Sequence, residues 1–309
     1  MPSLGSRLFL FLLRHHHLLR FQLRRRASVD WNTSISHLRQ ETGKPNRLFG
    51  KLPAGIKVSP IMMDELSGEW ILSSQMEKDK VILYAHGGGY AIGSCQAHRA
   101  IIAKFVKSSG VSALAFNYRL APEHPFPAAI DDSVAAYRYL LTQDILPSDI
   151  VLVGDSAGGG LCLATLLALR DLNVHLPAAA VVLSPWTDLN NTGESLVTKT
   201  KVDPLTWRES WTVFSKYYVG DNDPCLPLIS PLYGDLLGLP PILIHVGEDE
   251  LLLDDSKRFA EKAKNAGVDV TLKVWKGMFH CFPVCTPLFP EARRAMDEIC
   301  AFIKIHISN

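Results

Sequence analysis

Several features are missing from this sequence of 309 residues, and each absence excludes a class of protein. The six cysteines form no CxxC pair and no cysteine/histidine spacing of the zinc type, which argues against a structural metal site. The apolar run from Leu8 to Leu13 is too short for a transmembrane helix, and no clear small-residue cleavage site follows it. Neither glycine-rich run fits G-x-x-x-x-G-K-[ST] or G-x-G-x-x-G, so a nucleotide site is not indicated.

Charge is also nearly balanced, with 32 basic and 31 acidic side chains. The balance gives no electrostatic reason to expect a nucleic-acid partner. Scattered cysteines in a long chain are typical of free thiols in a reducing compartment, and we therefore expect a cytoplasmic protein. A regulatory disulfide between Cys281 and Cys285 is the alternative.

The pattern of apolar residues predicts an α/β fold with a mostly parallel sheet. Runs rich in branched and aromatic residues alternate with segments of helical periodicity, which indicates strands wrapped by helices. The expected strands are 58–64 and 69–73, forming an opening hairpin, then 81–86, 113–119, 149–154, 179–184, 242–247 and 270–275. The expected helices are 98–109, 128–142, 159–172, 255–266 and 291–307.

The N-terminal segment has an unusual composition. No acidic residue occurs from Met1 to Val29, where six arginines alternate with apolar residues. This pattern predicts an amphipathic helix. We expect it to cover the pocket of its own domain; docking on a membrane surface or a transit peptide are the alternatives.

The interval from Asn190 to Gly220 interrupts the alternation of strands and helices. It contains no convincing strand and carries an aromatic helix candidate, Arg208 to Val219. Helical material inserted after a sheet strand often forms a lid over the strand ends. The alternative is that the aromatic stripe only packs its own helix against the domain. The side chains concerned are Trp207, Trp211, Phe214, Tyr217 and Tyr218.

The stretch LVGDSAGGG, residues 152–160, contains the strongest candidate for a catalytic residue. It fits G-x-S-x-G, a sharp strand-to-helix turn that presents a serine nucleophile, here Ser156. A serine hydroxyl needs a base within hydrogen-bond reach. His280, in a loop beyond the last expected strand, is the better candidate; His245 lies within an expected strand and is interpreted as a core histidine.

Two further groups are needed for such chemistry, an acid and donors for an oxyanion. Glu248, Asp249 and Glu250 all follow the strand 242–247, and the physical chemistry of the sequence does not choose among them. The glycine-rich stretch His86-Gly87-Gly88-Gly89-Tyr90 follows the strand at 81 and can expose backbone N–H groups.

Taken in order along the chain, these motifs resemble the hormone-sensitive-lipase-like carboxylesterases of the α/β-hydrolase superfamily. The resemblance runs from about Leu52 to Phe302. It is carried by HGGGYAIGS, NYRLAPEHPFPAA, GDSAGGGL, LSPWTDL, ISPLY, LPPILIHVGEDELLLDD and WKGMFHCF. It implies an α/β-hydrolase catalytic domain over 51–309, with a cap insertion near 190–220, and an N-terminal cap segment over 1–50.

The resemblance also implies roles for individual residues. Ser156 is the nucleophile and His280 the base, and matching the family's D-x-L-x-D motif places the acid at Glu250. Because a glutamate replaces the commoner aspartate there, Asp249 remains a rival. The implied oxyanion donors are the N–H groups of Gly88, Gly89 and Ala157. No metal and no cofactor is required.

The function implied is a serine carboxylesterase that cleaves short to medium acyl esters, lactones included. Two alternatives stay open: a small-molecule receptor on the same scaffold, and a membrane-surface lipase that docks through the N-terminal segment. The expected partner is a small-molecule ester, with peripheral membrane contact and a homodimer as further expectations.

Overall fold

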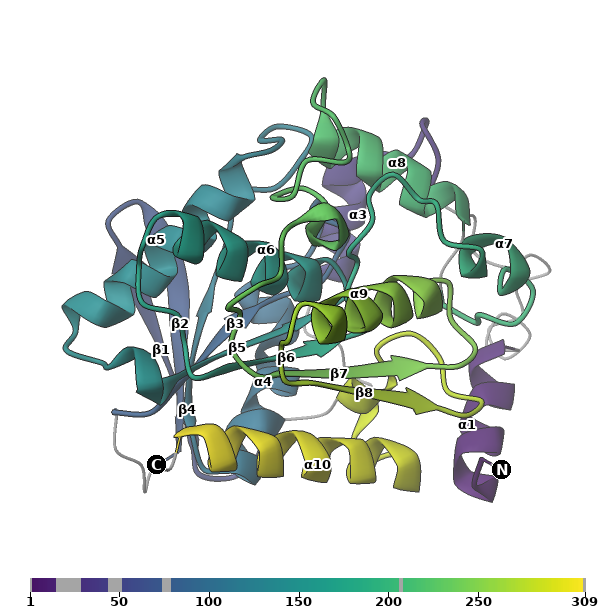
Figure 1. Ribbon diagram of the computed structural model, residues 1–309. Helices are drawn as coiled ribbons and strands as arrows, with labels where there is room; N and C mark the ends of the chain where they lie inside the picture. The colour runs from purple at the N-terminus through teal and green to yellow at the C-terminus, as the bar shows by residue number, and fades with distance from the viewer. Residues whose placement is uncertain (1, 15–28, 44–51, 74–78, 206–207, 308–309) are drawn as a thin grey trace.

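The structure is a computed structural model that describes residues 2–14, 29–43, 52–73, 79–205 and 208–307 (Figure 1). Its centre is one eight-stranded sheet in the order β1-β2-β4-β3-β5-β6-β7-β8. The strands are β1 (Ile56–Met63), β2 (Leu66–Ser73), β3 (Val81–Ala85), β4 (Ser112–Phe116), β5 (Ile150–Asp155), β6 (Ala179–Leu183), β7 (Ile242–Gly247) and β8 (Val270–Trp275). The prediction of an α/β-hydrolase fold is confirmed.

The burial of each strand matches the direction in which it pairs. β3 to β7 are buried along their whole length, as expected for parallel strands covered on both faces. β1 and β2 pair antiparallel, and β2 pairs antiparallel with β4, so the opening hairpin extends one edge. All carboxyl ends of the parallel strands therefore meet at one edge of the sheet, where ligands of open α/β folds bind.

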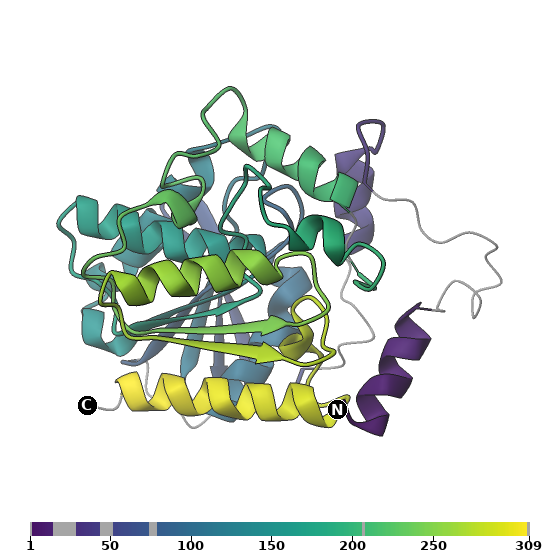
Figure 2. The same ribbon diagram turned by 45° about the vertical axis from the view of Figure 1, so that its right-hand side comes forward.

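Helices cover both faces of the sheet (Figures 1 and 2). Those on one face are α5 (Ala128–Thr142), α6 (Ala157–Asp171) and α9 (Leu253–Asn265). Those on the other are α4 (Cys95–Ser109) and α10 (Pro290–Ile307), joined there by α1 (Leu4–Arg14). Neighbouring strand residues serve opposite faces: Leu152 packs in the first core and Val151 and Val153 in the second. None of the helices within these described ranges is long and apolar enough to cross a bilayer.

Among the described residues, helices α3 (Ile35–Thr42), α7 (Ser195–Thr198) and α8 (Arg208–Val219) lie beyond the carboxyl edge (Figure 1). Residues before α3 contact α8 directly: Val29 N–H donates to Ser210 Oγ at 3.0 Å, and the ring of Trp31 packs edge-on against Tyr217. The described residues 29–43 and the insertion thus share a face. Trp207, which the sequence placed in the aromatic stripe, lies outside the described residues, as does the domain boundary at 50–51.

Helix α1 differs from the expectation that the N-terminal helix covers the pocket. It lies beside the start of α10 instead, with its Phe9 ring 5.2 Å from that of Phe289. Long-range contacts hold it there, because Leu10 is buried in the core shared with α10 and Ser3 Oγ donates to Glu291 at 2.8 Å.

Candidate active site

The turn between β5 and α6 places Ser156 at the carboxyl edge of the sheet. Its φ of 56° lies in the left-handed region, a strained conformation for a residue with a side chain. The turn is tight because its neighbours are glycines. A Cβ at Gly154 would lie 2.4 Å from the carbonyl of Gly158, and one at Gly158 would lie 2.1 Å from that of Ala85. Glycines at these two positions therefore allow the sharp strand-to-helix turn on which Ser156 lies.

The loop after β3 faces this turn. Gly88 and Gly89 have φ values of 124° and 61°, which favour glycine. Within the described part of the chain, no acceptor is bonded to the backbone N–H of Gly88, Gly89 or Ala157. Ala157 is the first residue of α6, where helical N–H groups lack intrahelical partners. Three free donors therefore lie on the two segments that carry the proposed oxyanion site.

Asp155, the residue before the nucleophile, ties these two segments together. Its Oδ1 accepts from Gly87 N–H at 3.0 Å and from the Tyr84 hydroxyl at 2.8 Å. His98 lies on its other oxygen at 3.7 Å. Burial acts to raise the pKa of Asp155, but His98 and these hydrogen bonds prevail and lower it to about 2. The carboxylate stays charged and holds the loop against the turn. Sequence reasoning missed this role, although Asp155 lies inside the quoted motif.

His280 lies in the loop after β8 and contacts Glu250. Its Nδ1 is 3.2 Å from Glu250 Oε1, and Glu250 is fully buried. The second oxygen of Glu250 accepts from Gly247 N–H at 2.7 Å and from the Ser184 hydroxyl at 2.8 Å. Both oxygens are thus held, and the carboxylate can orient one nitrogen of the imidazole. Ser184 is a contact that the sequence analysis did not identify.

The other two carboxylates of this segment point elsewhere. Glu248 accepts from Gly277 N–H at 3.0 Å, and Asp249 lies 3.7 Å from Lys199 Nζ. His245 is also occupied: its Nδ1 accepts from Trp275 Nε1 at 2.9 Å within the sheet. Burial, with help from Lys273, lowers the pKa of His245 to about 3. Of the three carboxylates that the sequence left open, Glu250 is the one that contacts His280.

Ser156 and the loop of His280 meet at one carbonyl oxygen. Leu183 O accepts from Ser156 N–H at 2.8 Å and from the Cys281 thiol at 3.6 Å. No hydrogen bond links Ser156 Oγ to His280 among the described residues, and His280 Nε2 lies 3.5 Å from Cys281 Sγ. Without substrate, catalytic hydrogen bonds are often long or misaligned and tighten in the reacting complex.

Electrostatics at this imidazole favour the charged ring. Burial acts to lower the pKa of His280, whereas the carboxylate of Glu250 beside its Nδ1 raises it, and the net direction is upward. A base must be neutral to accept a proton, so activity that depends on His280 should increase as pH rises through that pKa.

Aromatic side chains of helix α8 contact the segments that carry His280 and the glycine-rich loop. The indole of Trp211 packs edge-on against His280 with ring centroids 5.6 Å apart. Phe214 lies over the glycine loop, where a Cβ at Gly89 would come within 2.6 Å of its ring. Tyr218 stacks on Tyr90 at 3.8 Å. The aromatic stripe thus packs α8 against the domain and contacts His280 and Gly89, while a lid function stays a prediction.

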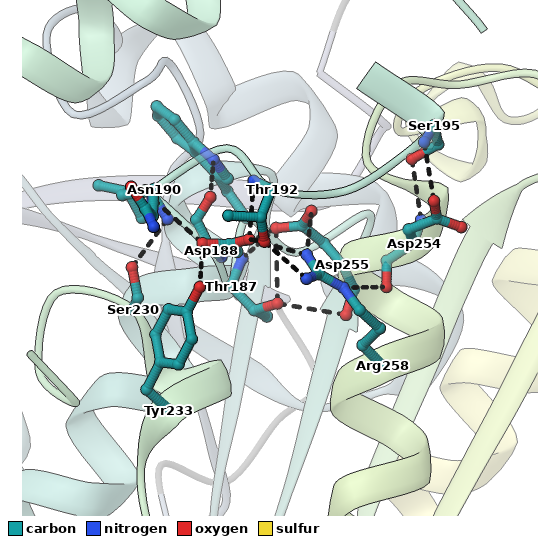
Figure 3. A network of polar contacts seen from close by, with 12 residues as sticks. Thr187, Asp188, Asn190, Thr192, Ser195, Ser230, Tyr233, Asp254, Asp255 and Arg258 are labelled. Atoms are coloured by element: carbon teal, nitrogen blue, oxygen red, sulfur yellow. Dashed lines mark hydrogen bonds and ion pairs between the residues drawn. The ribbon is translucent and has the colours of Figure 1, made fainter. Parts of the chain in front are cut away.

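A buried polar network braces the segment between β6 and the cap (Figure 3). Asp188 Oδ2 accepts from Arg258 at 2.8 Å, and its other oxygen accepts from the Tyr233 hydroxyl at 3.0 Å. Asp255 Oδ2 accepts from the N–H groups of Thr187 and Asp188, both at 2.9 Å. Burial and the nearby Asp188 raise the pKa of Asp255 to about 7. The network fixes α9, which follows Glu250, to the loop that carries Trp186.

The sequence also predicts free thiols, with a disulfide between Cys281 and Cys285 as the alternative. All six cysteines are free, so no disulfide joins Cys281 and Cys285. Among the residues with described positions, no group of three or more His, Cys, Asp or Glu side chains could hold a metal ion.

Comparison with known proteins shows which fold family the chain resembles. The α/β-hydrolase-fold family model matches residues 82–284. An acetyl-hydrolase of Streptomyces hygroscopicus is 40% identical over 287 residues, covering 91% of this chain and 95% of its own. An esterase of Acinetobacter venetianus is 39% identical over 278 residues, covering 90% and 91%.

Among solved structures, an esterase from the bacterial hormone-sensitive lipase family is 39% identical, with a TM-score of 0.90 over 99% of each chain. An esterase/lipase from an uncultured bacterium is 36% identical, with a TM-score of 0.89 over 99% of this chain and 100% of its own. The chain therefore belongs to the hormone-sensitive-lipase-like branch of the α/β-hydrolase family.

Proposed function

We propose that this chain is a carboxylic ester hydrolase that cleaves short to medium acyl esters, lactones included, through Ser156, His280 and Glu250. The observation that carries the proposal is the contact between His280 Nδ1 and the fully buried Glu250 beside the strained turn of Ser156. Relatives described as esterase and acetyl-hydrolase support the same reaction class.

The mechanism uses each contact in turn. Ser156 Oγ attacks the ester carbonyl while His280 Nε2 takes its proton, and Glu250 stabilises the imidazolium through Nδ1–H. The N–H groups of Gly88, Gly89 and Ala157 hold the oxyanion. His280 then gives the proton to the leaving alcohol, and a water molecule, activated by the same imidazole, releases the acid from Ser156.

The cap supports a limit on acyl length, because Trp211 and Phe214 lie directly over His280 and Gly89. Free and mostly buried cysteines support a reducing compartment, and cytoplasmic location stays a prediction on that basis. A homodimer also stays a prediction.

A panel of p-nitrophenyl esters with rising acyl length tests the proposal on the wild type and on Ser156→Ala. We expect the wild type to prefer short to medium chains and the variant to lose at least about 10⁴-fold in kcat. Undiminished cleavage by the variant would exclude Ser156 as nucleophile. No cleavage by either protein would favour a receptor on the same scaffold.

A further inference from the structure

Helix α1 carries apolar side chains on two sides, and among the described residues Phe9 and Leu10 pack on the fold. Leu10 is buried, and the ring of Phe9 lies 5.9 Å from Phe279 and 5.2 Å from Phe289. On the other side, three leucines spaced by four residues are 81%, 61% and 42% exposed: Leu4, Leu8 and Leu12. Residues four apart lie on one helix face, so these leucines form a single stripe.

The stripe belongs to the side of the molecule where the proposed active site lies. Both views show α1 near the carboxyl ends of β7 and β8 and the start of α10 (Figures 1 and 2). Phe279, which α1 contacts, immediately precedes His280. Arg14, the last residue of α1, donates to the carbonyl of Val202, just after α7.

Charge is distributed unevenly between this end and the rest of the chain. Residues 1–29 hold six arginines and no acidic residue. The rest of the chain holds the other 26 basic residues and all 31 acidic residues, so its net charge is negative. Arg7, on α1, is itself exposed. Arg7 and Arg14 lie on α1, and the other four arginines lie outside the described residues. By net charge alone, an anionic surface would attract the N-terminal segment and repel the rest of the chain.

We propose that the stripe of Leu4, Leu8 and Leu12 docks on the surface of an anionic phospholipid bilayer. A helix with exposed leucines and arginines without acidic residues has the composition of one that lies in the headgroup region. A second copy of this chain fits less well, because a symmetric contact would bring two acid-free, arginine-rich ends together. The arginines would be attracted to anionic lipid, whereas the arginines of two copies would repel each other.

Two weak attractions must act together here. Three leucines bury little surface, and arginines alone bind reversibly, so stable docking needs both signals. Docking should therefore weaken strongly in neutral vesicles, at high salt and when the leucines are replaced. Such a combined dependence distinguishes a bilayer from a purely apolar partner.

The test is cosedimentation of the full chain with phosphatidylcholine vesicles that contain about 30% phosphatidylglycerol. We expect the wild type to sediment with these vesicles, and about tenfold weaker partitioning for the triple variant Leu4→Ser, Leu8→Ser, Leu12→Ser. Arg7→Glu should weaken binding independently, since it reverses an exposed charge without removing apolar surface.

A matched control uses three exposed leucines far from α1. Leu146, Leu172 and Leu237 are 61%, 53% and 64% exposed and lie where segments lead back to the amino ends of strands. Their triple replacement by serine should leave vesicle binding unchanged. Unfolding midpoints close to that of the wild type show that both triple variants are folded.

Four outcomes would overturn the proposal. The first is no sedimentation of the wild type, and the second is equal binding to vesicles of phosphatidylcholine alone. The third is equal loss in both triple variants. The fourth is a dimer, seen by analytical ultracentrifugation, that depends on Leu4, Leu8 and Leu12 without any vesicle binding. None of these readouts needs ester hydrolysis, so they are independent of the proposed activity.

Discussion

The turn of Ser156 and helix α8 both border the proposed site, but their residues are constrained to different degrees. Every residue of β5 and residues 157–169 of α6 are buried, and added atoms at the glycines of the turn would meet backbone. Helix α8 buries only half of its residues and contacts the site through aromatic side chains. Backbone neighbours cannot yield as side chains can, so we expect the turn to tolerate far less change than the cap.

The largest difference should appear within the acidic segment, between two adjacent carboxylates. Glu250→Gln removes the charge that holds His280 and should lower kcat by about 10⁴-fold, because the imidazole loses both its orientation and its counter-charge. Asp249→Asn removes only a partly exposed pair with Lys199, worth at most about 1 kcal/mol, so kcat should fall less than about fivefold. Steady-state kinetics on one ester measure both. A greater loss for Asp249→Asn would identify it as the acid.

The same segment shows which features of the structure could be predicted from the sequence and which could not. The ends of the sheet strands, and of the helices that cover the sheet, were predicted to within a few residues, because apolar periodicity and flanking glycines are local signals. The choice among Glu248, Asp249 and Glu250 depended on a family pattern, since each follows the same strand. Only folding decides which carboxylate meets His280, because that contact joins residues 30 apart in sequence.

The cap could be predicted much less well. The insertion and its helix were anticipated from an aromatic stripe, whereas α3 and the position of α1 were not. Helix α1 reads as amphipathic in sequence, but its partner on α10 lies some 280 residues away, and no local pattern indicates that contact. Ser184 was missed for a similar reason: a lone serine after a strand gives no sign that it will donate to Glu250.

Gly88→Ala should produce the next largest effect, because it distorts the loop of the proposed oxyanion donors without changing Ser156, His280 or Glu250. The position has a φ of 124°, and a Cβ would lie 2.2 Å from the carbonyl of Ile92, so the loop must shift. Losing one oxyanion donor costs about 3 kcal/mol, so kcat should fall at least about 100-fold while KM changes little. Gly238→Ala is the control, because its φ is also positive but nothing lies within 4 Å. A rise in KM alone would contradict the proposed donors.

Arg39 on α3 should give a smaller effect, since it links the cap to the same loop. Its guanidinium donates to the carbonyls of Ala91 and Ala121, both at 2.7 Å, and pairs with Glu123. Arg39→Ala should lower kcat/KM about tenfold, because charged donors to backbone contribute roughly 1.5–3 kcal/mol each before the loop relaxes. Glu123→Gln keeps both carbonyl contacts and should change kcat/KM less than about fivefold. Equal effects from the two variants would mean that the ion pair, and not the loop contact, matters.

Asp255 should have the smallest effect on turnover and a clear one on stability. The folded protein raises its pKa to about 7, so the folded state holds this proton more tightly than the unfolded chain does. Stability contributed by the protonated group is lost as pH rises from about 4 to about 7, by up to about 3 kcal/mol between pH 5 and pH 8. Asp188, whose pKa is lowered, titrates below this window. Asn keeps an oxygen for the N–H groups of Thr187 and Asp188 and cannot ionise.

Urea unfolding at pH 5 and pH 8 measures this effect in the wild type and in Asp255→Asn. The variant should lose less stability than the wild type over that interval, and its kcat at pH 8 should stay within about twofold, because Asp255 does not contact Ser156, His280 or Glu250. Asp171→Asn, at an exposed carboxylate, should follow the wild-type pH dependence. Parallel curves for wild type and Asp255→Asn would show that the network carries its charge unchanged across this range. The brace behind the cap would then be a permanent ion cluster and not a group that ionises near neutral pH.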